Sequence, residues 1–264
     1  MIKEIRNFDL KMIADSGQCF RMKMTDKDHA VVIAKDRVLE IRTVKPGVFE
    51  FDCSETEFND IWNSYFDLDT DYDAFIAAVP KEDGFLKKAA EYGSGIRILR
   101  QDPFETLISF IISQRKSIPA ISTSIGKLCR MCGNEIREGF YSFPEPKALS
   151  QLSDIDLAQC SLGYRAEYVR EAAKSVYRGD TDPDMLQTLS DEDLFEALTS
   201  LKGVGKKVAN CVMLFGFHRI GAFPVDVWMQ KVIDEHYDGH FPVERYEGYA
   251  GVMQQYLFYC IRNE

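Results

Sequence analysis

Apolar and polar residues alternate along the first third of the chain, with the period of two that is typical of β-strands. Within residues 37–53, the alternate positions of one face carry mostly apolar side chains: Leu39, Ile41, Thr43, Phe49, Phe51 and Cys53. The sequence Lys45-Pro46-Gly47 separates the two halves of this run and supplies turn-forming residues. The pattern predicts a β-hairpin within an antiparallel sheet.

The period becomes helical after this hairpin. Ser54 and Glu57 form a capping-box sequence before an apolar stripe that continues to residue 66, and the acidic run 67–73 is expected to cap the next helix. Asp102 and Pro103 give an N-cap and a first-turn proline. Further helical periods occupy 119–132, 154–160, 165–178 and 190–199. We predict an α+β fold: an amino-terminal antiparallel β-sheet domain with helices (1–97), then an all-α domain (98–264).

The formal net charge of −10 argues mildly against a nucleic-acid partner, because Lys and Arg supply most contacts to phosphate. The local distribution of charge can override the total, and basic residues are denser over 115–127 and 165–178. A DNA partner would therefore have to meet one local face.

The sequence offers no signal peptide, and no apolar run reaches the roughly 20 residues of a membrane span. Seven scattered cysteines suit reduced thiols, and the pair Cys129 and Cys132 favours ordinary helix cysteines over a metal or redox site. We expect a cytoplasmic protein that does not associate with membranes.

The stretch "SLKGVGKKVANC" (200–211) places two glycines between a helix that ends near Thr199 and one that starts near Lys206. Two helices joined by a short glycine-containing turn form an αα-hairpin. Gly203 and Gly205 leave backbone amides uncovered, and the unpaired amides at a helix start can bind one phosphate. A purely structural turn is the other interpretation of these glycines.

Lys207 and Cys211 are four residues apart, so they share one face of the second helix. A lysine against apolar surface loses solvation of its ammonium form, which favours the free amine that nucleophilic attack requires. Nineteen residues further on, Asp226 precedes an apolar helical run in an N-cap position. Its carboxylate is either a simple cap or a group that stabilises positive charge at an adjacent sugar.

The stretch "LKGVGKKVANCVMLFGFHRIGAFPVDVW" (201–228) resembles the helix-hairpin-helix-Gly/Pro/Asp signature of the base excision DNA glycosylases. The resemblance implies that the hairpin, with Gly203, Gly205 and Lys206, binds DNA backbone, that Lys207 attacks the sugar and that Asp226 assists. The four clustered cysteines of the iron–sulfur branch are missing from the carboxy terminus, so we predict no cluster and no required cofactor.

Three further stretches resemble the 8-oxoguanine DNA glycosylase branch: "DSGQCFRM" (15–22), "LGYRAEYV" (162–169) and "AGVMQQYLFYC" (250–260). The resemblance implies four substrate-binding residues: Gly17, whose carbonyl accepts the N7–H of the oxidised base, Gln254 at its Watson–Crick edge, and Phe258 and Cys211 on its two faces. It also implies that Tyr164 wedges into the duplex and that Arg165 contacts the opposite base.

The loop "SQRKSIPAI" (113–121) departs from the family pattern. Arg115 stands where familiar eukaryotic members have an asparagine, and Ala120 stands where they have an arginine that reads the partner cytosine. Alanine cannot donate hydrogen bonds to cytosine, so we predict a relaxed preference for the opposite base, with Arg165 as the remaining reader. Trp228 stands where the eukaryotic members have a histidine, which puts in doubt one of the contacts that the resemblance implies with a DNA phosphate.

The family implies a bifunctional enzyme that flips 8-oxoguanine out of double-stranded DNA, excises it through a lysine Schiff base and nicks the strand by β-elimination. It also implies a monomer near the nucleoid, with a structural cation at the hairpin on the backbone carbonyls of Thr199, Leu201 and Val204. Two alternatives stay open: a monofunctional alkyl-purine DNA glycosylase, which needs no lysine nucleophile, and a non-catalytic module that binds damaged DNA.

Overall fold

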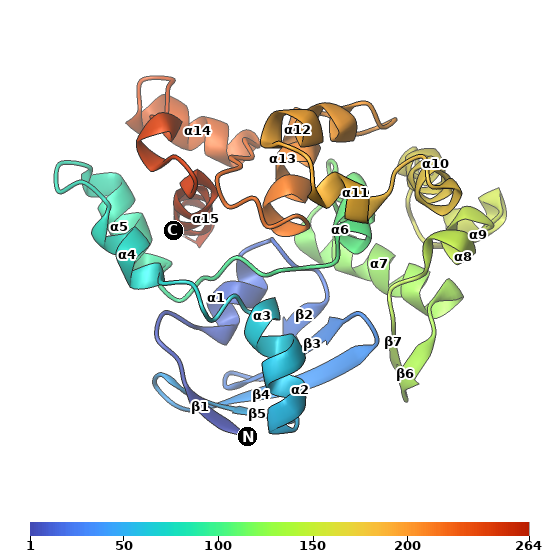
Figure 1. The fold of residues 1–264 in the computed structure, drawn as a ribbon, viewed down its shortest axis with the longest axis horizontal. Coiled ribbons are helices and arrows are strands. Elements are labelled where there is room, and N and C mark those ends of the chain that lie inside the picture. Colours follow the sequence, from blue (N-terminus) through green and yellow to red (C-terminus); the bar gives the residue numbers. More distant parts are fainter. Residues whose placement is uncertain (264) are drawn as a thin grey trace.

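The computed structural model of the chain describes residues 1–263, in which a small sheet lies against a larger group of helices (Figure 1). The five-stranded antiparallel sheet has the order β1-β5-β4-β3-β2. Its strands are β1 (Ile2–Glu4), β2 (Met22–Met24), β3 (His29–Ala34), β4 (Arg37–Lys45) and β5 (Val48–Phe51). The pairing of Ile41 with Phe51 and of Thr43 with Phe49 confirms the predicted hairpin.

Helix α1 (Leu10–Asp15) and a helical segment after the sheet bury its apolar face. That segment runs through α2 (Glu55–Glu57), a π-helical turn η1 (Phe58–Trp62) and α3 (Asn63–Tyr65). Ser54 caps it by accepting a hydrogen bond from the Glu57 amide, as predicted. The Glu57 carboxylate, however, accepts a hydrogen bond from the Trp62 indole at 3.0 Å. The cap therefore comes from Ser54, and Glu57 fixes Trp62 in the core.

The remaining helices follow in chain order. They are α4 (Tyr72–Ala77), α5 (Gly84–Tyr92), α6 (Pro103–Ser113), α7 (Ile118–Cys132), α8 (Pro146–Ser150), α9 (Asp154–Gln159), α10 (Arg165–Arg178), α11 (Pro183–Gln187), α12 (Asp191–Thr199), α13 (Lys206–Phe215), α14 (Val227–His236), the 3₁₀ turn η2 (Val243–Tyr246) and α15 (Ala250–Asn263). Asp71, in the acidic run 67–73, caps α4 as predicted, and Ser190 caps α12.

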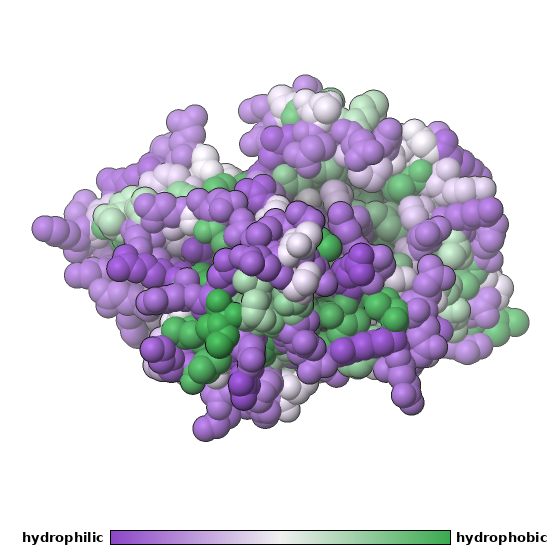
Figure 2. Space-filling view, turned by 60° about the horizontal axis from the view of Figure 1, so that its bottom comes forward, coloured by the Kyte–Doolittle hydropathy of each residue, from purple (hydrophilic) through white to green (hydrophobic). Residues whose placement is uncertain are grey.

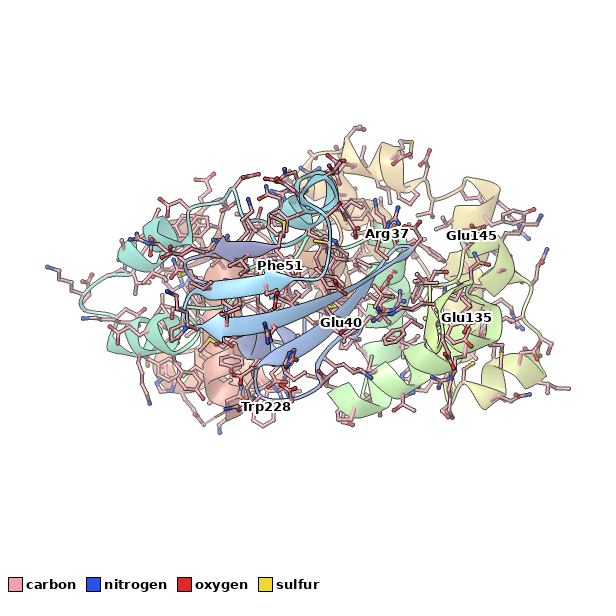
Figure 3. The ribbon with its side chains drawn as sticks, turned by 90° about the horizontal axis from the view of Figure 1, so that it is seen from below. Arg37, Glu40, Phe51, Glu135, Glu145 and Trp228 are labelled. Atoms are coloured by element: carbon pink, nitrogen blue, oxygen red, sulfur yellow. The ribbon has the colours of Figure 1, made fainter. Side chains whose placement is uncertain are left out.

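A two-stranded hairpin, β6 (Glu135–Arg137) and β7 (Phe140–Tyr141), interrupts the part that we predicted to be all-α. Its strands are too short to give a clear alternation of apolar and polar residues. Arg137 forms an ion pair with Glu40 of β4 at 2.5 Å, so the hairpin is tied to the sheet. Figure 3 labels Glu40 on the sheet and Glu135 on the hairpin. Arg21, close to β2, makes a second link through a buried ion pair with Glu105 of α6 at 3.0 Å.

The two hydrophobic cores divide the chain at a different place from the predicted boundary at residue 97. The sheet core contains buried residues from Phe8 to Phe66 together with Leu99. Residues of α4 and α5, such as Tyr72 and Leu86, belong to the helical core. These two helices lie beside α14 and α15 in Figure 1. Local sequence patterns do not say which core a helix joins. The domain boundary at residue 97 stays a prediction.

Asp67, in the acidic run before α4, connects both parts of the molecule. Its buried carboxylate accepts hydrogen bonds from Tyr72 and Arg100, and lies 3.3 Å from the ring of His218, just after α13. Burial raises the pKa of Asp67, but hydrogen bonds and charge from His218 and Arg100 outweigh it, so the pKa is lowered. This carboxylate therefore fixes the chain leaving α13.

Within residues 1–263, no helix is both long and apolar enough to cross a membrane.

Candidate active site

The turn between α12 and α13 presents an open helix start. Gly203 has a φ of +84°, and a Cβ at this position would lie 2.4 Å from Cγ of Tyr168, so both backbone conformation and space require glycine. Gly205 is the N-cap of α13, and a Cβ there would meet nothing within 4 Å. No side chain caps α13. Its first amides therefore face open space and can bind an anion.

Lys207 is the second residue of α13 and is half-buried, whereas Lys206 is exposed. The Lys207 ammonium lies 5.0 Å from the centroid of the Phe110 ring on α6. Phe110 in turn stacks on Phe215 of α13 at 5.5 Å. The apolar wall expected beside Lys207 therefore includes Phe110, a residue that the sequence reasoning missed because it is distant along the chain.

Asp226 caps α14, as predicted from its position. Its Oδ1 accepts hydrogen bonds from the amides of Trp228 at 3.0 Å and Met229 at 2.9 Å. Because these bonds use one carboxylate oxygen, Oδ2 keeps its lone pairs for another cation or donor. A simple cap and a charge-stabilising role are thus compatible in the same side chain.

Cys211 brings Lys207 and Asp226 into one electrostatic environment. Burial raises the pKa of the Cys211 thiol; the charge of Lys207 and a hydrogen bond from it oppose this rise, and the charge of Asp226 adds to it. The lysine and the carboxylate thus both act on one sulfur. A thiol with a raised pKa stays neutral near pH 7 and presents an uncharged, polarisable surface.

The Gly17 loop lies between α1 and β2 and is held in place by Gln18. The Gln18 amide donates to the Arg97 carbonyl at 2.8 Å and accepts from the Leu99 amide at 2.8 Å. Gly17 has a φ of +76°, and a Cβ there would lie 3.2 Å from Cε1 of Phe258. Two predicted base-pocket residues, 241 positions apart, are therefore neighbours.

Helix α15 supplies the rest of this candidate pocket. Gln254 is buried, and its Oε1 accepts a hydrogen bond from Nε2 of Gln255 at 3.0 Å, which fixes the amide orientation. Phe258 is half-buried, with the guanidinium of Arg262 at 5.2 Å from its ring. At the start of α15, a Cβ on Gly251 would meet Leu214 of α13 at 2.6 Å. This close approach fixes α15 against the helix that carries Lys207.

An aromatic contact connects the Gly17 loop with the lysine. Phe20 lies three residues after Gly17, and its ring meets Phe110 edge-on at 5.5 Å. Since Phe110 also lies beside Lys207, the pocket residues and the lysine are joined through two aromatic rings.

Tyr164 and Arg165 lie at the start of α10, with contrasting exposure. Tyr164 is 54% exposed, whereas Arg165 is 7% exposed. The Arg165 guanidinium packs on the Tyr164 ring at 4.4 Å and donates hydrogen bonds to the carbonyls of Gln114 and Leu162. A direct contact between Arg165 and a base would require breaking these bonds, whereas more than half of the Tyr164 side chain is open to solvent.

The loop 113–117 is also tied to the glycine turn. Nε2 of Gln114 donates to the Gly203 carbonyl at 3.0 Å, so Gln114 connects Arg165 to the open start of α13. Arg115 and Ala120 are both exposed, and Arg115 has a φ of +52°. The sequence reasoning missed Gln114 because its role depends on contacts between residues about 50 to 90 positions apart.

Trp228 is 43% exposed at the start of α14 and lies at the edge of the molecule in Figure 3. The other tryptophan, Trp62, is fully buried. On the face drawn in Figure 2, hydrophobic residues form separate patches within a mostly hydrophilic surface. An exposed indole two residues from Asp226 is thus a distinct feature of the candidate site.

Metal-binding side chains do not gather anywhere in the described part of the chain: residues 1–263 hold no group of three or more His, Cys, Asp or Glu arranged for an ion. The predicted cation site uses backbone carbonyls instead. The Leu201 carbonyl already accepts a hydrogen bond from the Val204 amide at 3.0 Å, and a carbonyl oxygen has a second lone pair for a cation. The turn is chemically suited to a hard cation.

Two family profiles match the chain one after the other. "8-oxoguanine DNA glycosylase, N-terminal domain" matches residues 1–107, and "HhH-GPD superfamily base excision DNA repair protein" matches residues 108–240.

Solved structures and curated proteins agree with these profiles. The 8-oxoguanine glycosylase/lyase of Clostridium acetobutylicum in its apo form is 36% identical, with a TM-score of 0.92 over 98% of this chain and 95% of that chain. The same enzyme with double-stranded DNA containing cytosine opposite 8-oxoG is 35% identical, with a TM-score of 0.93 over 100% of this chain and 98% of that one. A probable N-glycosylase/DNA lyase of Methanothermobacter thermautotrophicus is 29% identical over 96% of this chain and 93% of that protein. The chain therefore belongs to the 8-oxoguanine DNA glycosylase family of the helix-hairpin-helix base excision DNA repair proteins.

Proposed function

We propose that this protein is a bifunctional DNA glycosylase and AP lyase that excises 8-oxoguanine from double-stranded DNA. One observation carries the proposal: Lys207, whose ammonium lies 5.0 Å from the Phe110 ring, is the second residue of a helix that no side chain caps. Asp226, which like Lys207 acts on the pKa of the Cys211 thiol, keeps Oδ2 for another cation or donor. The arrangement combines an anion-binding helix start, a nucleophile and a carboxylate in one place.

DNA would meet the protein on the face that carries the α12–α13 turn and Tyr164. The amides around Gly203 and Gly205, with Lys206, bind a phosphate, and Tyr164 enters the stack as the damaged nucleotide leaves it. The flipped base lies between Cys211 and Phe258. The Gly17 carbonyl accepts its N7–H, which normal guanine lacks, and Gln254 binds its Watson–Crick edge.

The reaction begins when Nζ of Lys207 bonds to C1′ of the deoxyribose. The C1′–N9 bond breaks, and its electron pair leaves with the base, which takes up a proton. Asp226 stabilises the positive charge that develops on the sugar and on the attacking nitrogen. Opening of the sugar ring gives a Schiff base. Loss of a C2′ proton then expels the 3′ phosphate, which nicks the strand.

A cation on the carbonyls of Thr199, Leu201 and Val204 would add positive charge near the phosphate at the turn. The catalytic residues complete the chemistry without it. Replacing K⁺ and Na⁺ in the assay buffer with tetramethylammonium at equal ionic strength should weaken DNA binding several-fold and leave the rate of the bound complex unchanged.

The opposite base is expected to matter little. Ala120 cannot donate a hydrogen bond from its side chain, and the donors of Arg165 are bonded to backbone carbonyls. The excision rate should therefore vary less among the four partner bases than it does for an enzyme with a dedicated cytosine reader.

A gel assay with and without alkali tests the activity. A labelled duplex with 8-oxoguanine should be cut without alkali, because β-elimination follows base loss. Cleavage only after alkali would indicate the monofunctional alternative, and tight binding without any product would indicate a non-catalytic module.

A further inference from the structure

Two lysines that have no role in the proposed reaction, Lys116 and Lys127, both form hydrogen bonds with Ser161, three residues before Tyr164. Nζ of Lys116 donates to the Ser161 carbonyl at 2.6 Å and to Oγ of Ser124 at 2.6 Å. Nζ of Lys127, on α7, donates to Oγ of Ser161 at 2.9 Å. Ser161 is exposed and has a φ of +58°, so its hydroxyl stands at the surface between two ammonium groups.

No carboxylate lies within ion-pair distance of either lysine in the described part of the chain, although Asp156 and Lys127 both act on the pKa of the Cys160 thiol. Among residues 1–263, neither lysine forms an ion pair, although the chain carries 42 acidic residues against 32 basic ones. The charged groups that act on Lys116 are Arg165 and Lys127, both positive; with burial, which is the larger cause, they lower the pKa of Lys116. In an acidic protein, three cations gathered without an ion-paired carboxylate indicate a site for an external anion.

Each lysine keeps donors for such an anion. An ammonium group has three N–H donors; the bonds above use two of those of Lys116 and one of those of Lys127. Arg165 does not compete for the ligand, because its guanidinium is buried and bonded to carbonyls. Helices α6, α7 and α10, which carry or flank these groups, lie together on the right of Figure 1.

We propose that Lys116 and Lys127, with the Ser161 hydroxyl between them, bind a DNA phosphodiester beside Tyr164, and that this phosphate clamp holds the duplex whichever base lies opposite the lesion. The placement next to the lesion rests on the proposed function. Phosphate contacts fix position and carry no sequence information, so they complement an enzyme that lacks a cytosine reader at position 120.

The test measures binding to a duplex with a tetrahydrofuran abasic analogue, by fluorescence anisotropy over a series of KCl concentrations. The variant Lys116→Ala with Lys127→Ala should lower the magnitude of the slope of log Kd against log[KCl] by about 1 to 2, since each lost phosphate contact contributes about 0.9. Lys87→Ala, at an exposed position of α5 far from the clamp, is the control. An unchanged slope in the double variant would overturn the proposal.

Because Lys116 also holds the loop at Ser161, a charge-conserving variant is needed. The variant Lys116→Arg with Lys127→Arg should keep most of the wild-type slope of log Kd against log[KCl]. Neutral methylphosphonates, scanned one by one along both strands, should weaken the wild type at one or two positions and have no effect there on the alanine variant. If each methylphosphonate lowered the DNA affinity of the wild type and the alanine variant equally at every position, the clamp would be overturned.

Four duplexes with different bases opposite the analogue separate a phosphate contact from a base contact. If the alanine variant binds all four duplexes more weakly by the same factor, the result supports the clamp. Weaker binding to the duplex with one particular opposite base contradicts it. Excision of 8-oxoguanine is measured independently. A chain that fails to excise the base but shows the predicted change of slope would refute the proposed function and leave the clamp standing.

Discussion

The proposed lesion side and the proposed partner-strand side of this protein are built differently. On the lesion side, the residue types expected from the family resemblance all occur, and the fold brings Lys207, Asp226 and Cys211 into one electrostatic environment. On the proposed partner-strand side, Ala120 stands where the family resemblance implies a base reader, and Arg165 is bonded to backbone carbonyls. Bond-breaking chemistry needs particular functional groups in a particular arrangement, whereas a duplex can be held by several combinations of cations and amides.

The largest effect should come from the lesion side. Lys207→Gln removes the nucleophile, and we expect the single-turnover excision rate to fall by about three orders of magnitude or more. Lys206→Gln, one position earlier and exposed, should retain the rate and weaken DNA binding only slightly. Comparable excision by Lys207→Gln and the wild type would mean that another group attacks the sugar.

The next effect concerns stability. Asp67→Asn removes the charge that pairs with His218 and Arg100, and we expect a loss of about 2 kcal/mol in the free energy of unfolding. The pKa of Asp67 is lowered on folding, so its contribution is present above the ordinary value of 3.8 and is lost as the pH falls further. Urea midpoints from pH 7 to pH 3 should therefore drop less steeply in the variant. If the urea midpoints of the wild type and the variant fell in parallel with pH, Asp67 would not be the titrating group.

The glycine turn gives a smaller, directional effect. Gly203→Ala adds a Cβ at a φ of +84° that would lie 2.4 Å from the Tyr168 ring, so about 1 to 3 kcal/mol of stability should be lost and DNA binding weakened. Gly205→Ala is the matched control, because its Cβ meets nothing within 4 Å. Urea melts and anisotropy titrations of both variants measure this difference. Equal losses would mean that Tyr168 does not constrain the turn.

The smallest effect should lie on the partner-strand side. Arg165→Ala releases the Gln114 carbonyl and loosens loop 113–117. We expect Kd to rise by about tenfold or less, and by the same factor for all four partner bases, because the arginine acts on the protein backbone. A loss seen only with cytosine would establish Arg165 as a base reader.

Local features of the fold could be predicted from the sequence. The caps at Ser54, Asp71 and Ser190 depend on residues two or three positions away, and the positive φ of Gly203 follows from a tight turn between two helices. The predicted strands at 37–53 follow from the period of two. Each of these signals is contained within a short segment, so no knowledge of the tertiary structure was needed.

Long-range features could not be predicted in the same way. Asp67 joins His218 across 151 positions, and Gln114 joins Gly203 across 89. Nothing in the local sequence of either residue distinguishes it from an ordinary turn or helix end. The assignment of α4 and α5 to the helical core likewise depends on what they pack against. For the candidate site, motif spacing indicated the lysine and the aspartate, but not the ring of Phe110 beside the lysine.

Borohydride trapping tests the central claim most directly. The wild type and Lys207→Gln would each be incubated with duplexes carrying 8-oxoguanine opposite each of the four bases, and covalent complexes resolved on a denaturing gel. The account predicts a band of similar intensity for all four partners in the wild type and none in the variant. A band that persists in Lys207→Gln would contradict the assignment of the nucleophile, and a band restricted to cytosine would contradict the relaxed partner preference.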